Sequence, residues 1–206
     1  MTWGEPCGNP GEVYHYNDTG YILLGEIIEN IYGKPLGIAL NELLCFERLG
    51  INTTWIEKQQ ASRSALFPQV HQYNGDVDFN TIDATWDLYG GGGLVSTVGD
   101  LARFTRALFT HQIYQSPDTL KIMLSTVENA QGGSIAYGRL QVAGVYRMGI
   151  ESAYNGRVYS HTGYLGTYAG YVSSHDLTLS LSFSEHNTER RKALIESIYT
   201  LFSIAP

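Results

Sequence analysis

The feature that most constrains the fold is a series of closely spaced strand-like segments in the last part of the chain. Three of them follow one another at Tyr159–Gly163, Thr167–Ser173 and Leu177–Ser184, joined by short Gly-containing or His-Asp connections. Connections this short cannot make the crossover that parallel neighbours need, so the pattern predicts an antiparallel sheet. In the last segment Leu and Phe alternate with Thr and Ser, which indicates that one face is buried.

Helices are predicted before and after these strands. A closing helix from Asn187 to Phe202 has an apolar stripe available to cover the sheet. The residues of that stripe are Ala193, Leu194, Ile198, Leu201 and Phe202. Earlier in the chain, helices are predicted to begin at Asp18 or Thr19, Leu36, Ser96 or Thr97, and Ser116. Asn74-Gly75 is the one clear hairpin signal between them.

These elements predict an α+β protein with one domain over residues 1–206. With 206 residues and 43% hydrophobic content, the chain can fill a single ordinary core. Residues 1–130 are expected to form a mainly helical region, and residues 131–206 the antiparallel sheet and the C-terminal helix. No internal repeat or low-complexity linker divides the chain.

Charge and cysteine content exclude several kinds of site. The 13 Lys and Arg against 20 Asp and Glu give a net charge of -7, without a basic run that follows a phosphate backbone, so no nucleic acid partner is expected. Cys7 and Cys45 have no C-x-x-C spacing, and no histidine pair has metal-ligand spacing, so neither a metal nor a cofactor is expected. No export signal or membrane span is visible, which leaves the localisation open.

Three stretches, in this order, resemble a known superfamily. They are Pro10–Gly25, which contains Tyr-His-Tyr-Asn-Asp-Thr-Gly-Tyr, then Gly91–Thr97 (Gly-Gly-Gly-Leu-Val-Ser-Thr), and His161-Thr162-Gly163. The chain is similar to the serine β-lactamases, penicillin-binding proteins, D-alanyl-D-alanine carboxypeptidases and related esterases, with a class C β-lactamase-like pattern. The resemblance implies a β-lactamase/transpeptidase-like fold, in which an antiparallel sheet is flanked by helices and a helical region is added.

The first stretch carries the proton chemistry that the resemblance implies. A serine hydroxyl is a poor nucleophile at neutral pH, so this superfamily places it one helical turn before a lysine, in Ser-x-x-Lys. By resemblance, the Tyr16 hydroxyl relays the serine proton to the leaving group. Asp18 stands where an amide side chain usually holds the lysine and the substrate carbonyl. A carboxylate there favours an ion pair with the lysine over an amide hydrogen bond.

The last stretch is expected to form the opposite wall of the site. By resemblance, His161, Thr162 and Gly163 line the cleft on a strand, as a Lys-Thr-Gly element does in relatives. Gly163 lets the substrate backbone come close, and the N–H of Tyr164 is one of two donors to the oxyanion. Thr162, Gly163 and Tyr164 are therefore the expected substrate-binding residues, and Tyr16, Asp18 and His161 the expected catalytic ones.

The nucleophile itself is absent from this sequence. The residues three positions before the four lysines are Ile31, Trp55, Asp118 and Glu189, so there is no Ser-x-x-Lys. A Gly-x-Ser-x-Gly elbow is absent as well. We therefore expect an N-terminally truncated domain that lacks the first strands and the nucleophile helix and is inactive alone.

Plainer interpretations exist for each of these residues. Tyr16 can be a packing aromatic at the helix entry, Asp18 a helix N-cap, and His161 a hydrogen-bonded strand histidine. Gly90–Gly93 has no Gly-Lys-Ser/Thr ending, so it is interpreted as a backbone crossing near the cleft floor and not as a phosphate loop.

Two functions follow from these observations. The first is a hydrolase fragment that acts on an amide or ester, such as a β-lactam, a D-Ala-D-Ala-like peptide or a small ester. The second is a non-catalytic binding or interaction module with the same fold. The expected partners are a small-molecule or peptide substrate and, at the open sheet edge along Leu177–Ser184, a missing N-terminal segment or a second copy of the chain.

Overall fold

A computed structural model describes residues 18–60, 66–83, 89–124, 126–128, 134–136, 141–142, 158–202 and 204. The α-helices are α1 (Thr19–Tyr32), α2 (Leu36–Leu43), α3 (Val98–Phe109), α4 (Pro117–Leu124) and α5 (Thr188–Leu201). The strands are β1 (Trp55–Ile56), β2 (Tyr73–Asn74), β3 (Val77–Asp78), β4 (Leu94–Val95), β5 (Thr126–Glu128), β6 (Ser134–Ala136), β7 (Gln141–Val142), β8 (Val158–Thr162), β9 (Thr167–Val172) and β10 (Leu177–Ser182). Short 3-10 turns are η1 (Phe79–Thr81), η3 (Tyr89–Gly91) and η4 (Ser173–His175).

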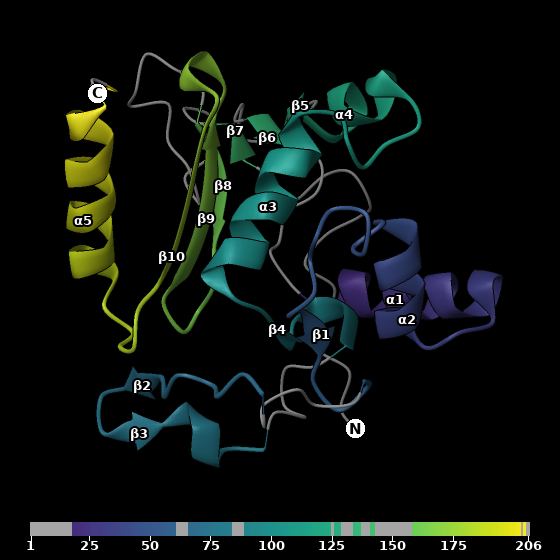
Figure 1. Ribbon diagram of the computed structural model, residues 1–206, viewed down its shortest axis with the longest axis horizontal. Helices are drawn as coiled ribbons and strands as arrows, with labels where there is room; N and C mark the ends of the chain where they lie inside the picture. Colours follow the sequence, from purple (N-terminus) through teal and green to yellow (C-terminus); the bar gives the residue numbers. More distant parts are fainter. Residues whose placement is uncertain are drawn as a thin grey trace.

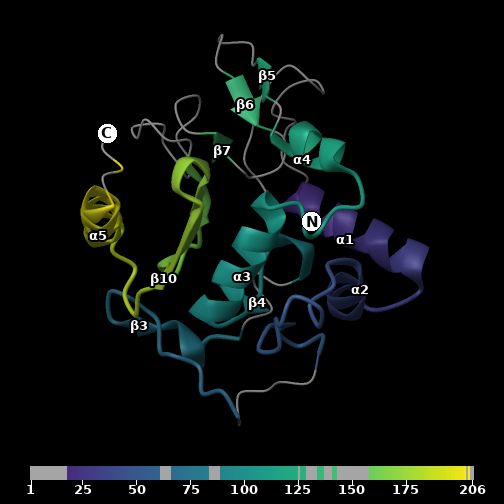
Figure 2. The ribbon, with the colours of Figure 1, turned by 45° about the horizontal axis from the view of Figure 1, so that its top comes forward.

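The main sheet has the strand order β10-β9-β8-β7, and all its neighbours are antiparallel. The predicted antiparallel sheet is thereby confirmed. The last predicted strand ends at Ser182 and not at Ser184, because the carbonyl of Ser184 accepts a hydrogen bond from the N–H of Tyr73 in β2, 2.8 Å away. Figures 1 and 2 show the sheet between α5 on one side and α3 on the other.

One face of the sheet packs against α5. Its core consists of Val158, Tyr168, Val172, Tyr199 and Ile204, with Leu177, Leu179, Leu181 and Ile195 packed around them. The Tyr168 and Tyr199 hydroxyls are 2.6 Å apart and buried, so each satisfies the other. A Cβ at Gly170 would lie 2.5 Å from the Tyr168 hydroxyl oxygen, which explains the glycine opposite this pair.

The other face packs against α3 and α4 through aromatic rings. Phe109 of α3 stacks on Tyr159 and Tyr171, with ring centroids 5.0 Å and 5.1 Å apart. Such pairs contribute about 0.5–1.5 kcal/mol each beyond the area that they bury. Leu108 and Leu120 complete this second core. Arg106 of α3 forms a bidentate ion pair with Asp176, which ties the helix to the β9–β10 turn.

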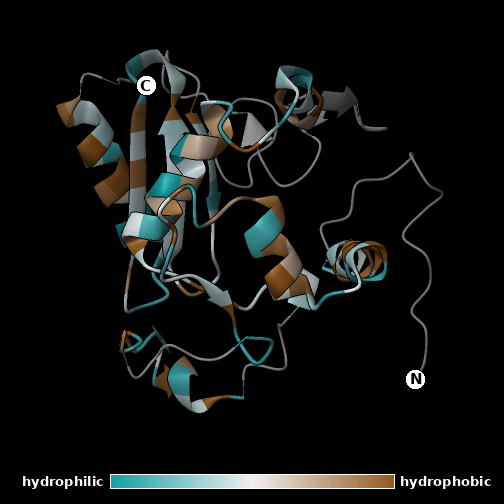
Figure 3. Ribbon diagram, turned by 45° about the vertical axis from the view of Figure 1, so that its right-hand side comes forward, coloured by the Kyte–Doolittle hydropathy of each residue, from teal (hydrophilic) through white to brown (hydrophobic). Residues whose placement is uncertain are grey.

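The stripe predicted for α5 is wrong. Leu194 and Leu201 are 42% and 82% exposed, and the residues that face the sheet are Arg191, Ile195 and Tyr199. Arg191 and Tyr199 find hydrogen-bond partners on the sheet, in the Gly163 carbonyl and the Tyr168 hydroxyl. A hydropathy pattern places such polar residues on the exposed side of a helix. Figure 3 shows hydrophobic residues recurring along α5 at the left of the view.

Helix α1 is confirmed, but most of its apolar residues are not buried. It ends at Gly33, whose φ of 61° is left-handed and whose N–H donates to the Glu29 carbonyl 2.7 Å away. Gly25 is its only buried residue, because α1 packs on α2 and η3 through that side. Leu24 and Ile31 are 52% and 73% exposed. The described part of the chain therefore covers only one side of α1.

Candidate active site

Of the residues predicted for the tyrosine motif, Tyr16 lies outside the described residues and Asp18 stands at the start of α1. The Asp18 carbonyl accepts hydrogen bonds from the N–H groups of Tyr21 and Ile22, 2.9 Å and 3.0 Å away. Its carboxylate makes no capping bond to the first turn of the helix. Asp18 therefore occupies the N-cap position without the side-chain role that a cap residue usually has.

The glycine-rich segment packs directly on this end of α1. A Cβ at Gly91 would lie 2.8 Å from the Cβ of Asp18, and one at Gly90 would overlap the Tyr21 carbonyl oxygen. Only glycine allows the two backbones to approach this closely. A close backbone approach is thus observed at Gly90 and Gly91 of the predicted Gly90–Gly93 crossing, and it supports the turn that carries Asp18.

Tyr89, the first residue of η3, packs against α1 beside Gly25. Its ring would be 2.7 Å from a Cβ at Gly25, so the ring fills the space beside that buried glycine. Burial raises the pKa of the Tyr89 hydroxyl to about 12, and the Glu29 carboxylate acts in the same direction. Tyr89 therefore stays protonated at neutral pH and acts as a packing residue here, not as a base.

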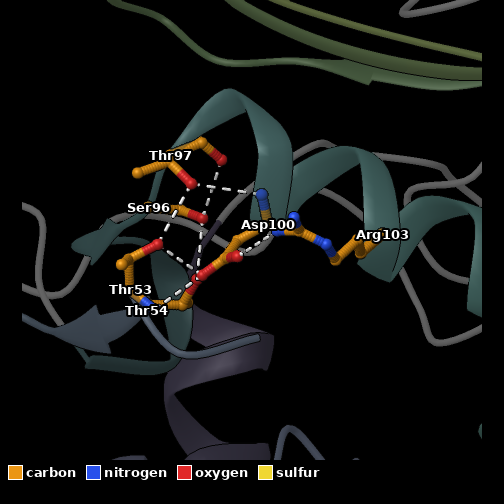
Figure 4. Close-up of polar contacts among 6 residues, drawn as sticks. All are labelled: Thr53, Thr54, Ser96, Thr97, Asp100 and Arg103. Carbon is orange, nitrogen blue, oxygen red and sulfur yellow. Dashed lines mark hydrogen bonds and ion pairs between the residues drawn. The ribbon is translucent and has the colours of Figure 1, made fainter. Parts of the chain in front are cut away.

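A buried carboxylate holds the segment that leads out of the glycines (Figure 4). Asp100, 3% exposed, accepts hydrogen bonds at Oδ2 from the N–H and the hydroxyl of Thr53, 2.7 Å and 2.6 Å away. Oδ2 also accepts from the Thr54 hydroxyl, and Oδ1 from Arg103 at 2.8 Å. Thr97 caps α3 by accepting from the Asp100 N–H, as one of the two predicted caps. This polar cluster fixes the loop at Thr53-Thr54 to the start of α3.

The cluster continues into the small β1–β4 ladder. Ile56 pairs with Leu94, and the Glu57 N–H donates to the Gly93 carbonyl 2.9 Å away. The two ends of the Gly90–Gly93 segment are therefore held, one by the α1 contact and the other by this ladder. The sequence predicted the Thr97 cap of α3 and the glycine crossing, but not that Thr53 and Thr54 would hydrogen-bond Asp100.

His161 and Thr162 lie at the end of β8 and are half-buried. His161 pairs with Ala169 and is on the same face as Tyr159 and Tyr171, the side on which α3 packs. Strand alternation puts Thr162 on the opposite face. Of the two, only His161 is therefore on the side of the sheet toward α3 and, beyond it, α1 (Figures 1 and 2).

Most backbone polar groups of the turn after β8 are hydrogen-bonded. The Gly163 N–H donates to the Thr167 carbonyl at 2.8 Å, and the Gly163 carbonyl accepts from the Gly166 N–H at 3.2 Å. The Gly163 carbonyl also accepts from Arg191 Nη1 at 3.1 Å. In the described part of the chain, the N–H groups of Tyr164 and Leu165 are the ones in this turn without an acceptor. Tyr164 as a residue is 54% exposed, and its N–H belongs to a turn that these hydrogen bonds hold in place.

The β2–β3 hairpin fixes Tyr164 from below the sheet. Asn74 Nδ2 donates to the Tyr164 hydroxyl at 2.8 Å, and Gln72 Nε2 donates to the Leu165 carbonyl at 3.0 Å. The His186 ring lies 4.6 Å from the Tyr164 ring, and its Nδ1 hydrogen-bonds the Tyr164 carbonyl. Asn74-Gly75 correctly predicted this hairpin. No sequence signal indicated that it contacts the turn after His161-Thr162-Gly163.

Arg191 is a functional candidate that the sequence analysis did not identify. It stands within Glu-Arg-Arg-Lys at the start of α5, where a run of charges is usually solvated. The structure instead buries it against the Gly163 carbonyl. Among the described residues, no group of three or more His, Cys, Asp or Glu can hold a metal ion. Nor does any helix there have the length and hydrophobicity to cross a membrane.

With the fold and these contacts in place, comparison with known proteins decides the family. The sequence model of the Beta-lactamase family matches residues 4–198. The chain belongs to the Beta-lactamase family. Membership confirms the superfamily that the three motifs indicated.

Individual relatives agree with this assignment. A penicillin-binding protein of Bacillus subtilis strain 168 is 26% identical over 204 residues, which cover 91% of this chain and 44% of that protein. D-amino acid amidase from Ochrobactrum anthropi SV3, in complex with D-phenylalanine, superposes with a TM-score of 0.71 at 20% identity, covering 95% of this chain and 60% of the amidase. A penicillin-binding protein from Bacillus halodurans gives a TM-score of 0.68 at 17% identity, covering 93% and 57%. The fold is thus that of the family, and the chain spans about half the length of these relatives.

Proposed function

We propose that this chain supplies two walls of a serine acyl-transfer site that acts on an amide or ester carbonyl. It is proposed as a single β-lactamase-like domain over residues 1–206. Tyr16 and Asp18 belong to one wall, and the end of β8 forms the other, with His161 on the α3 side of the sheet and Thr162 and Gly163 at the end of the strand. The observation that carries the proposal is the Tyr164 N–H, which lacks an acceptor among the described residues in a turn whose other polar groups are mostly bonded. A donor held in a hydrogen-bonded turn and not used by the described residues suits an oxyanion that forms only during reaction.

In the proposed reaction, a serine Oγ attacks the carbonyl carbon and its proton passes through Tyr16 to the leaving amine or alcohol. The carbonyl oxygen becomes an oxyanion that accepts from the Tyr164 N–H until the bond to the leaving group breaks. Water then attacks the acyl-enzyme, its proton returns to the serine, and the acid is released. The serine and its lysine come from a Ser-x-x-Lys segment outside these 206 residues, because the chain contains none.

The isolated 206-residue chain is expected to hydrolyse neither a chromogenic β-lactam nor a p-nitrophenyl ester above background. Oxyanion donors without the nucleophile give little turnover. Steady-state assays of the purified chain test this, and mass spectrometry after incubation with the substrate tests for acylation. Saturable turnover that Tyr16→Phe abolishes, or an acyl adduct on any serine of the chain, would contradict it.

A non-catalytic binding module is the second candidate, and the same missing Ser-x-x-Lys favours it. Such a module keeps the cleft walls and binds a D-Ala-D-Ala-like peptide or a protein partner without turnover. The nucleotide sequence upstream of the Met1 codon separates the two functions. An in-frame Ser-x-x-Lys supports the hydrolase, and a stop codon with a ribosome-binding site supports the module.

The edge of the sheet gives a second prediction. Within the described residues β10 pairs with β9 alone, and its outer edge presents unpaired backbone groups. We propose that the Ser-x-x-Lys segment, or a second copy of the chain, adds a strand along Leu177–Ser182. The isolated chain is therefore expected to form dimers or larger assemblies in sedimentation velocity, in a concentration-dependent manner, and to become monomeric when the segment is supplied.

Hydrogen exchange on the same samples identifies the surface used. Association through this edge should protect the β10 amides that do not pair with β9, and dilution should release them. A monomer at all concentrations, with slowly exchanging outer amides along Leu177–Ser182, would mean that the edge is covered from within the chain.

A further inference from the structure

Arg191 is a buried cation with one hydrogen-bond partner for its side chain among the described residues. It is 8% exposed, and Nη1 donates to the Gly163 carbonyl at 3.1 Å. No carboxylate of the described residues forms an ion pair with it. Burial lowers the pKa of its guanidinium, because the charged form loses water. Within the described residues, the Gly163 carbonyl alone compensates the burial of this charge, which points to an effect of the arginine on that peptide group.

Its neighbour Arg190 has the same charge but differs in burial and in its hydrogen-bond partner. Arg190 is 75% exposed at the side chain and pairs with Glu185 at 3.2 Å. The two arginines are adjacent on the same turn of α5 and have the same charge, but only Arg191 contacts the turn after β8. Arg190 is therefore a matched control for Arg191.

The atom that Arg191 contacts is one end of a single peptide group. The Gly163 carbonyl and the Tyr164 N–H belong to the same planar, conjugated amide. A cation that donates to the carbonyl oxygen draws electron density toward that oxygen and leaves the N–H more positive. The N–H then donates more strongly to an anionic acceptor on its own side.

We propose that Arg191 is a positioning residue that orients and polarises the Gly163–Tyr164 peptide, so that the Tyr164 N–H becomes a stronger donor to an oxyanion. The inference rests on the proposed function, in which this N–H meets the oxygen of the tetrahedral intermediate. Arg191 itself touches neither substrate nor nucleophile. The Gly163 N–H bond to Thr167 and the His186 bond to the Tyr164 carbonyl hold the flanking atoms, so Arg191 changes the charge distribution of a fixed group.

The first test is spectroscopic and needs no activity. In ¹H,¹⁵N spectra of the chain, Arg191→Met is expected to shift the Tyr164 amide proton and nitrogen upfield, since the carbonyl of the same peptide loses its cationic donor. Base-catalysed exchange of the Tyr164 amide should slow by roughly 3-fold or more, because a less positive N–H is less acidic. Arg191→Lys keeps a charged donor and should restore part of both effects, while Arg190→Met should leave them unchanged.

Loss of folding is separated from loss of polarisation by a milder variant. Arg191→Gln keeps a neutral N–H donor and is expected to give an intermediate Tyr164 shift with the other amide resonances of the sheet unchanged. Tyr164 resonances that are the same in the wild type, Arg191→Gln and Arg191→Lys would overturn the proposal.

The second test uses the protein that contains its Ser-x-x-Lys segment. For p-nitrophenyl ester hydrolysis, Arg191→Met should lower kcat by roughly 5- to 50-fold, less than the 10²–10³-fold of a lost oxyanion donor, with KM changed by less than about 2-fold. Arg190→Met should change neither. Full activity of Arg191→Met together with a shifted Tyr164 amide would overturn the catalytic role of the polarisation. A wild-type protein without turnover would instead remove the proposed function, and the spectra would still decide the effect of Arg191 on the peptide.

Discussion

Asp100→Ala is expected to lower the free energy of unfolding by about 2–4 kcal/mol, a large share of the stability of a domain this size. The carboxylate is 3% exposed and accepts from two threonines and Arg103. Its removal leaves the Thr53 N–H without its acceptor and Arg103 without its partner. The hydroxyls of Thr53 and Thr54 keep only Thr97 and Ser96 as partners. Asp100→Asn keeps one acceptor oxygen and should lose less.

Asp118→Ala is the control for this change. Asp118 is also in the first turn of a helix and pairs with a basic residue three positions later at 2.8 Å, but its side chain is 69% exposed. Exposed pairs of this kind contribute about 0–1 kcal/mol. Urea unfolding followed by circular dichroism measures both variants. Equal losses for Asp100→Ala and Asp118→Ala would show that burial of the Asp100 cluster contributes no stability of its own.

The sheet and most helix boundaries were predictable because they depend on local patterns. Alternating apolar and polar residues at Leu177–Ser182 indicate a strand, and Gly33 indicates a helix end that needs a left-handed backbone conformation. Both signals lie within a few residues of the feature they predict. The Asn74-Gly75 turn is similar, since Gly75 has a φ of 58° that few other residues adopt. Such signals survive in any tertiary context, so they could be identified from the sequence.

The faces that the helices bury were less predictable. In α5 the sheet selects Arg191 and Tyr199, because the Gly163 carbonyl and the Tyr168 hydroxyl provide hydrogen-bond partners at those positions. Leu201, with higher hydropathy, is 82% exposed. Which face of an amphipathic helix is buried depends on atoms contributed by distant segments, and a single helix sequence does not contain that information.

In the candidate site as well, local motifs were predictable from the sequence and the long-range contacts that hold them were not. The order of the motifs located Asp18 and His161 on two separate elements, as the resemblance implied. The contacts that hold those elements come from residues outside the three family motifs. Thr53 contacts Asp100, Asn74 contacts Tyr164, and Arg191 contacts Gly163. These supporting residues are 28 to 90 positions from their partners in the sequence, so only the folded chain could show the contacts.

Tyr16→Phe is expected to have the largest effect on activity. In the protein that contains its Ser-x-x-Lys segment, this change should reduce kcat by roughly 10²–10⁴-fold, the scale of a lost general acid–base group, with a smaller effect on KM. Phenylalanine keeps the aromatic ring and removes only the hydroxyl, the atom to which the proposed function assigns the proton relay.

Tyr32→Phe, at the other end of α1 and 43% exposed, removes the same atom far from the motif and should leave kcat within about 2-fold of wild type. Steady-state hydrolysis of a p-nitrophenyl ester by the three proteins makes the comparison, with acyl-enzyme formation followed by mass spectrometry. In Tyr16→Phe both acylation and turnover should slow, because the serine proton and the leaving group depend on the same hydroxyl. An unchanged kcat in Tyr16→Phe would remove Tyr16 from the mechanism and leave it the packing role that its position at the helix entry also allows.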